Sequence, residues 1–265
     1  MSFQEAHTLE EHRDYLYKIV HLQLFFVHLW LEKHQDETFR DVLRNRVDIY
    51  RKTDANPEAL NPRVLHFDTH AWLNMEQAAE KIYESTRSDR ATFETAAFEV
   101  FKPSIDSRCE RDYLDTSALA NYQCGSLRHE LALNKDGETI HFHIANAVSP
   151  KSIFDEPAYL AGCFRHLMDK TEKELGAKRI ATSTWLNMNP KWLKYFPESW
   201  KINMAAPHKN VQWHYGFWGQ FISARHTFND KLGDYLRQTG ELRYYPCGSS
   251  CSMEEMRKHL DDMGF

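Results

Sequence analysis

Two histidines near the middle of the chain are the residues best placed to do chemistry. His141 and His143 alternate with apolar residues in segment 138–145, a period of two that predicts a β-strand. The dipeptide Asp136-Gly137 separates this segment from a second alternating segment, 126–133, and such a turn predicts a hairpin. One face of the expected hairpin therefore carries two imidazoles.

The burial of apolar side chains predicts the register of this hairpin. A continuous apolar face forms only if Arg128 and Glu130 lie beside the two histidines, because a slip by one residue would set leucines against imidazoles. A two-residue turn would place Glu130 directly across from His143, with Cβ atoms about 4.5–5.5 Å apart. A carboxylate there would hold one imidazole tautomer and raise its basicity. The residues expected on the apolar face are Leu127, Leu131, Leu133, Ile140, Phe142 and Ile144.

Three interpretations of this histidine hairpin stay open at the level of sequence. In the first, His143 is a general base that Glu130 orients. In the second, His141, His143 and Glu130 bind Fe or Zn, with His214 as the best candidate for a further imidazole. In the third, the face is polar and solvated and has no function.

A second candidate feature is the aromatic segment 211–222, which we expect to form a long strand. Its two glycines, Gly216 and Gly219, are typical of a bulge or of close approach by a ligand. In a catalytic role, His214 or Tyr215 would polarise a substrate or donate a proton. The alternative is a structural role, in which the aromatic side chains pack a sheet against a helix. The side chains expected to bind a flat or aromatic small molecule are Trp213, Tyr215, Trp218, Trp185 and Asn187.

The elements that must position these residues fall into two regions. Thr8 and Glu11 form a capping-box pattern that predicts a helix to about residue 34. Further helices are expected at 37–52, 69–83 and 91–101, with breaks at Asn56-Pro57 and Asn61-Pro62 and an end at Pro103. After the hairpin we expect helices at 155–175, 190–196, 229–238 and from 253, strands at 179–184 and near 201, and a turn around Cys247 and Cys251. The sequence thus predicts a helical region, 1–103, followed by an α/β domain, 104–265.

Segment 141–221 resembles the C-terminal half of the GNAT-like acyltransferases. The matching motifs are His143-Ile144-Ala145, Cys163-Phe164, Thr184-Trp185-Leu186 with Pro190, and Ser199-Trp200 with Asn203. The resemblance implies a mixed sheet with flanking helices, and an acyl-CoA or acyl carrier donor.

One departure from the family concerns the turn that would hold the cofactor pyrophosphate, at 146–152. This turn has no glycine, and Pro150 removes one amide donor. Phosphate contacts would then come from Ser149, Lys151 and Ser152. The resemblance therefore implies the fold more strongly than the use of CoA.

Composition narrows the classes of function. The chain has 265 residues and a net charge of −5, which argues against a groove that binds nucleic acid through its phosphates. The most apolar stretch, 19–31, is too short to span a bilayer, and five cysteines without framework spacing indicate a reducing cytoplasm. We expect a small-molecule enzyme, an acyltransferase or a catalyst of a related reaction. The alternatives are a metal-dependent lyase, hydrolase or oxygenase, and a ligand-binding module without catalysis.

Overall fold

The computed structural model describes residues 6–56, 65–115 and 119–265, so the predicted breaks at Pro57 and Asn61-Pro62 lie outside the described residues. The chain divides into two compact units. Unit 1 comprises 1–118 and 211–243, and unit 2 comprises 119–210 and 244–265. The boundary expected after residue 103 falls inside a helix, and segment 211–243, expected in the α/β domain, belongs to the helical unit.

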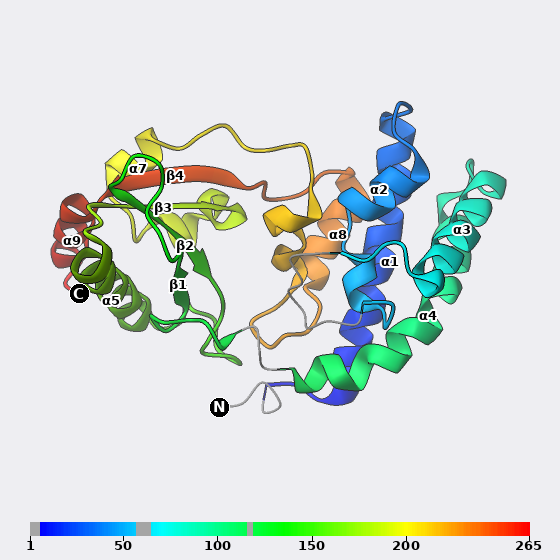
Figure 1. Cartoon of the computed structure of the whole chain (residues 1–265), viewed down its shortest axis with the longest axis horizontal. Coiled ribbons are helices and arrows are strands. Elements are labelled where there is room, and N and C mark those ends of the chain that lie inside the picture. Colours follow the sequence, from blue (N-terminus) through cyan, green and yellow to red (C-terminus); the bar gives the residue numbers. More distant parts are fainter. Residues whose placement is uncertain (1–5, 57–64, 116–118) are drawn as a thin grey trace. The chain divides into compact units, whose positions relative to one another are not determined.

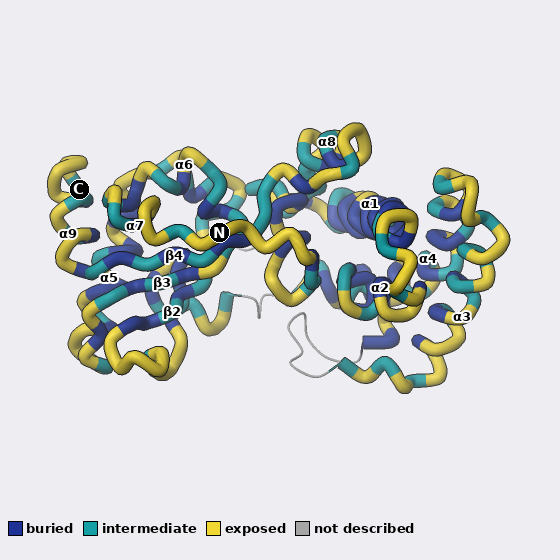
Figure 2. The backbone as a smooth tube through the Cα atoms, turned by 90° about the horizontal axis from the view of Figure 1, so that it is seen from above, coloured by how far each residue is buried: buried dark blue, intermediate teal, exposed yellow. Residues whose placement is uncertain are grey.

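Unit 1 is helical, and its centre is a long buried helix. Its described elements are α1 (Leu9–Lys33), α2 (Phe39–Asn45), η2 (Ile49–Lys52), α3 (His70–Ser85), α4 (Arg90–Leu114), η5 (Trp213–Tyr215), η6 (Phe217–Phe221) and α8 (Asp230–Thr239). The predicted capping box of Thr8 and Glu11 opens α1. The sequence offers Asp68 or Thr69 as the cap of the third helix, and Thr69 is the residue that caps α3. Figure 2 shows α1 as largely buried. Within the described ranges, no helix is both long and apolar enough to cross a membrane.

Two helices of unit 1 differ from prediction. The helix expected at 37–52 breaks after Asn45 into α2 and η2, and the break lets Asp48 accept a hydrogen bond from the buried Gln23. The helix expected to end at Pro103 continues as α4 to Leu114. A proline inside a helix removes one backbone hydrogen bond. Burial of the residues beyond Pro103, Ile105 and Cys109 among them, offsets that loss.

The aromatic segment forms two 3-10 turns, η5 and η6, instead of the long strand that its alternation predicts. Gly216 has a φ of 72° and ends η5 in the left-handed region, where a glycine carries no steric cost. The indole of Trp218 is buried and donates a hydrogen bond to the carbonyl of Arg46 at 2.9 Å. The glycines therefore mark turns. Phe217, Trp218 and Phe221 are buried in unit 1, whereas Tyr215 is 46% exposed.

Unit 2 is a four-stranded mixed sheet with helices (Figure 1), so the chain is of the mixed α/β class. The strands are β1 (Leu127–His129), β2 (Thr139–Ile144), β3 (Arg179–Thr184) and β4 (Cys247–Ser252), in that order. β2 pairs with β3 in parallel, and the other pairs are antiparallel. The helices are α5 (Pro157–Leu175), η4 (Trp185–Met188), α6 (Pro190–Leu193), α7 (Glu198–Ile202) and α9 (Met253–Asp262).

Two elements of unit 2 differ from prediction. The segment around Cys247 and Cys251, expected to be a turn, is strand β4. Its cysteines are buried, but the serines and the glycine between them show no clear alternation of apolar and polar residues that would predict a strand. The strand expected near Lys201 is helix α7. By contrast, β3 has the predicted bounds, and α5 ends as predicted at Gly176, with a φ of 70°.

The core of unit 2 covers one face of the sheet. Phe142 on β2 packs against Phe164 of α5, with ring centroids 5.9 Å apart, and lies close to Trp192 and Trp200. α9 adds Met256 to the same core, and Figure 1 shows it beside α5. Side chains on the opposite face stay partly exposed. We call it the polar face, and its residues are Arg128, Glu130, His141, His143, Ala181, Ser183, Gly248 and Ser250.

Candidate active site on the polar face of the sheet

The register of the hairpin differs from prediction by two residues. Arg128 lies across from His143, and the amide of Glu130 donates to the carbonyl of His141 at 2.9 Å. The offset arises from a bulge just before the turn. There, three residues that follow the first strand, 131–133, lie opposite a single residue of the second, Ile140. A shift of two keeps Arg128 and Glu130 on their predicted face, since side chains alternate with a period of two.

The bulge changes which residues reach the core. Leu131, expected on the apolar face, is 84% exposed. His129 is buried across from Phe142 instead, and its Nδ1 hydrogen-bonds with the carbonyl of Glu130 at 2.8 Å. The hairpin thus buries an imidazole where the sequence predicts only leucines.

Glu130 nevertheless hydrogen-bonds with His143, by reaching diagonally across the strands. Its carboxylate accepts from Nε2 of the imidazole, and long side chains span such diagonal positions. The hydrogen bond with His143 lowers the pKa of Glu130, so the carboxylate stays ionised at neutral pH. With Nε2 held, Nδ1 is the nitrogen of His143 that can exchange a proton with a bound molecule.

His141 gives the polar face a second imidazole of different character. Its ring centroid lies 5.2 Å from that of His143, in an edge-to-face arrangement. Burial and the neighbouring His143 lower the pKa of His141, so this ring is neutral at pH 7. A neutral imidazole donates or accepts a hydrogen bond without adding charge.

Small residues flank the imidazoles on the next two strands. Ala181 of β3 lies beside His141 and pairs with Ser250 of β4, and Ser183 pairs with Gly248. A Cβ atom placed on Gly248 would meet nothing within 4 Å. Side chains this short leave room over the sheet next to the two histidines.

The residues of the predicted aromatic wall do not lie on a strand of this sheet. Trp213, His214, Tyr215 and Trp218 all belong to unit 1, whereas the two strand histidines belong to unit 2. The ring of Trp213 lies 5.3 Å from the guanidinium of Arg51. The ring of His214 lies 4.4 Å from that of Tyr215. The prediction placed these residues on a long strand, and two 3-10 turns replace that strand.

Asn187, predicted to contact substrate, is instead a buried structural residue. Its Nδ2 donates to the carbonyls of Thr182 and Cys247 at 3.2 and 2.7 Å. Its Oδ1 accepts from the indoles of Trp192 and Trp200 at 3.0 and 3.2 Å. Both amide hydrogens and the amide oxygen of Asn187 are thus hydrogen-bonded inside the core of unit 2.

Trp185, also predicted to contact substrate, stacks on Tyr244 with ring centroids 5.9 Å apart. Both residues belong to unit 2, and Trp185 packs against the edge of its core. Its contacts are those of a core aromatic residue.

The turn that the resemblance assigns to phosphate has an unfavourable charge. The ammonium of Lys151 pairs with Glu156, and the amide of Ser152 donates to Asp155 at 2.9 Å. Both carboxylates stand directly before the N-terminus of α5, where an anionic ligand would bind. This charge disfavours the predicted contacts of Ser149, Lys151 and Ser152 with a pyrophosphate.

The geometry of the described residues adds no support to the metal interpretation. Across 6–56, 65–115 and 119–265, no group of three His, Cys, Asp or Glu side chains is arranged to hold a metal ion. His141, His143 and Glu130 are therefore not found as such a group. Burial raises the pKa of Cys247 to about 11 and that of Cys251 to about 12, so both thiols stay protonated.

Sequence reasoning missed a buried chain of polar groups in unit 1. His12 Nε2 lies 3.1 Å from Asp112 Oδ2, and His7 Nε2 lies 3.2 Å from His12 Nδ1. The ring of His226 follows at 5.7 Å from that of His7. These residues come from the start of α1, the end of α4 and a loop far along the chain, so no local spacing joins them.

Accessibility distinguishes this buried chain from the polar face. His7, His12 and Asp112 are only 5%, 8% and 6% exposed. Burial raises the pKa of Asp112, but the hydrogen bond from His12 and the charge of Lys52 outweigh it and lower the pKa. The chain is thus an internal ion-pair network. The side chains of His143 and Glu130 are 36% and 47% exposed and can meet a substrate.

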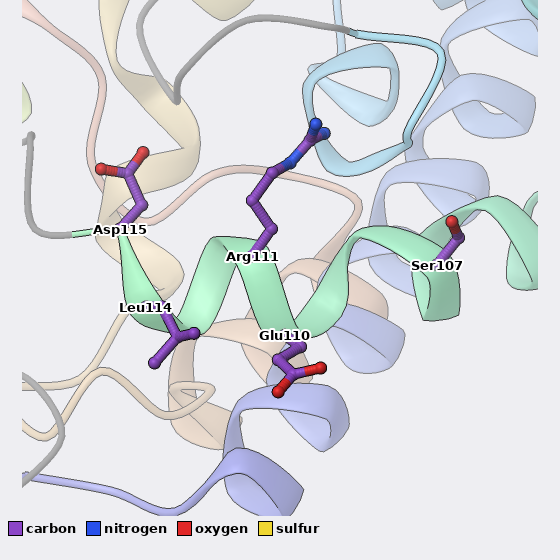
Figure 3. Close-up of a pocket in the computed structure, with 5 residues that line it drawn as sticks. All are labelled: Ser107, Glu110, Arg111, Leu114 and Asp115. Atoms are coloured by element: carbon purple, nitrogen blue, oxygen red, sulfur yellow. The ribbon is translucent and has the colours of Figure 1, made fainter.

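A pocket on α4 offers no competing site. Ser107, Glu110, Arg111, Leu114 and Asp115 line it. In Figure 3 the side chains of Glu110 and Leu114 lie on the opposite side of the helix from Arg111 and Asp115, so the polar groups do not converge.

Comparison of the chain with protein-family models, curated proteins and solved structures finds no match. The resemblance of segment 141–221 to GNAT-like acyltransferases therefore stays a prediction. The site rests on its own geometry.

Proposed function

We propose that this protein is an enzyme that transfers an acyl group to a small molecule, with His143 as general base. The observation that supports the proposal is the hydrogen-bonded pair of Glu130 and His143 on a partly exposed sheet face. An imidazole oriented by a carboxylate is a common way to take a proton from a nucleophile. A GNAT-like arrangement of unit 2 is part of the same proposal.

The proposed reaction uses a thioester donor, either acyl-CoA or an acyl carrier protein. The amine or hydroxyl of the acceptor attacks the thioester carbonyl while His143 Nδ1 takes its proton. The new C–N or C–O bond forms as the C–S bond breaks, and the thiolate leaves with the electron pair of that bond. The imidazolium returns its proton to the thiolate, and Glu130 stabilises the imidazolium in between.

Thiol release from the full chain tests this proposal. Acetyl-CoA and an acetylated carrier protein serve as donors, with a panel of small amines and alcohols as acceptors. We expect acceptor-dependent release that falls about 10²–10⁴-fold in His143→Ala, the usual contribution of a general base. Glu130→Gln lowers it by a smaller factor. The matched control is His166→Ala, which removes an exposed histidine of α5 in the same unit and leaves the rate unchanged.

Two results would overturn the proposal. One is thiol release in His143→Ala equal to that of the unaltered protein. The other is the absence of acceptor-dependent release with every donor, which would favour a ligand-binding module.

A further inference from the structure

We propose that the acceptor carries a carboxylate and that Arg128 binds it beside His143. This inference rests on the proposed function, because it names the class of molecule that the same site takes. Arg128 is the residue of β1 that lies directly across from His143 on β2. Cross-strand partners have Cβ atoms about 4.5–5.5 Å apart, so a molecule touching one side chain lies within reach of the other.

Arg128 has an unused donor at this position. Within the described part of the chain its Nε is buried and has no hydrogen-bond partner, although the residue as a whole is partly exposed. A buried donor without a partner is costly, and a ligand that supplies an acceptor removes that cost. A guanidinium presents its donors as a planar fork that matches the two oxygens of a carboxylate.

An aromatic ring supports the guanidinium. The Cζ atom of Arg128 lies 5.8 Å from the ring centre of Tyr122, which is itself partly buried. Stacking of this kind restricts the guanidinium before any ligand arrives, so less conformational entropy is lost on binding.

The charge of the site favours a monoanion. Arg128 lies close enough to Glu130 to lower the pKa of that carboxyl, after the larger effect of His143. The charges of the guanidinium and of Glu130 already sum to zero, so a bound monoanion leaves one net negative charge and a phosphate dianion leaves two, which makes the dianion the less favourable ligand. The other arginine near this face, Arg179 at the start of β3, already donates to the hydroxyl of Ser250 at 3.3 Å. Of the two arginines on the described strands, Arg128 is therefore the one with a donor left for an anion.

Benzoate, with benzamide as its neutral counterpart, tests this inference on the full chain without any turnover. The Nε–H resonance of Arg128 and calorimetry report binding. We expect benzoate, but not benzamide, to shift that resonance. Arg128→Gln weakens benzoate binding about tenfold or more, as for loss of a charged hydrogen bond. Arg128→Lys restores part of the affinity, and Arg179→Gln, the matched control, leaves it unchanged.

The outcomes separate this inference from the proposed function. Equal binding of benzoate by Arg128→Gln and by the unaltered protein would overturn the inference, as would loss of binding in Arg179→Gln alone. Benzoate binding that persists in His143→Ala supports it, because anion binding does not need the base. If benzoate binds through Arg128 while His143→Ala leaves thiol release intact, only the proposed function fails. If thiol release depends on His143 but benzoate does not bind, only this inference fails.

Discussion

Replacement of Asn187 by leucine is expected to destabilise unit 2 strongly. The substitution keeps a side chain of similar size but removes the acceptor of two buried indoles and the donor to two backbone carbonyls. Each buried polar group left without a partner costs about 1–3 kcal/mol. Because neighbouring losses are not additive, we expect a total of about 3–5 kcal/mol, a large fraction of the roughly 5–15 kcal/mol that holds a typical domain.

Urea unfolding gives the free-energy difference, and hydrogen exchange of the indole N–H groups of Trp192 and Trp200 locates it. In the unaltered protein both indoles are bonded to Asn187 and we expect slow exchange, whereas Asn187→Leu exposes them to fast exchange. Asn134→Ala, in the exposed hairpin turn, is the matched control and changes stability by less than about 0.5 kcal/mol. An Asn187→Leu protein as stable as that control would refute the assignment of Asn187 to the core.

Two further perturbations test unit 1. Glu76 is fully buried and accepts two hydrogen bonds of 2.6 Å from Arg44. We therefore expect Glu76→Ala to lower the free energy of unfolding by about 3–5 kcal/mol, measured in urea. A loss below about 1 kcal/mol would contradict the importance of this pair. Burial, together with His7 and His12, lowers the pKa of His226 from 6.5 to about 4, so the folded chain excludes a proton that the unfolded chain binds below pH 6.5. Stability is therefore full above pH 6.5 and falls toward pH 4 by about 1–2 kcal/mol, reduced for partial exposure. We expect His226→Gln to flatten the plot of Tm against pH over that window, unlike the exposed-site control His166→Gln, and equal slopes in the two variants would contradict this assignment.

Local signals predicted the elements that local interactions decide. The capping box at Thr8 and Glu11 and the glycine at 176 set the start of α1 and the end of α5, and both are confirmed. The two faces of the hairpin were predictable because alternation survives a shift of two residues. The residue directly across from each side chain was not predictable, because the bulge at 131–133 depends on which residues the core accepts.

The remaining differences arise from tertiary contacts. The alternation of Trp213, Tyr215 and Phe217 is typical of a strand, yet Gly216 and the bond from Trp218 to Arg46 turn the chain into unit 1. The chain from His7 to His12 and Asp112 joins residues about a hundred positions apart, which spacing does not reveal. A polar residue close to several tryptophans in sequence is typical of a substrate contact, so Asn187 was predicted to bind substrate. In the fold it accepts hydrogen bonds from the indoles of two of those tryptophans.

Chemical rescue of His143→Ala by imidazole tests most directly whether this side chain moves the proton. Imidazole in solution can enter the space left by the missing ring and accept the proton of the acceptor in its place. We expect thiol release by His143→Ala to rise with imidazole concentration, while release by Glu130→Gln, which keeps its own imidazole, does not. A His143→Ala protein that retains the full rate without imidazole would contradict the account.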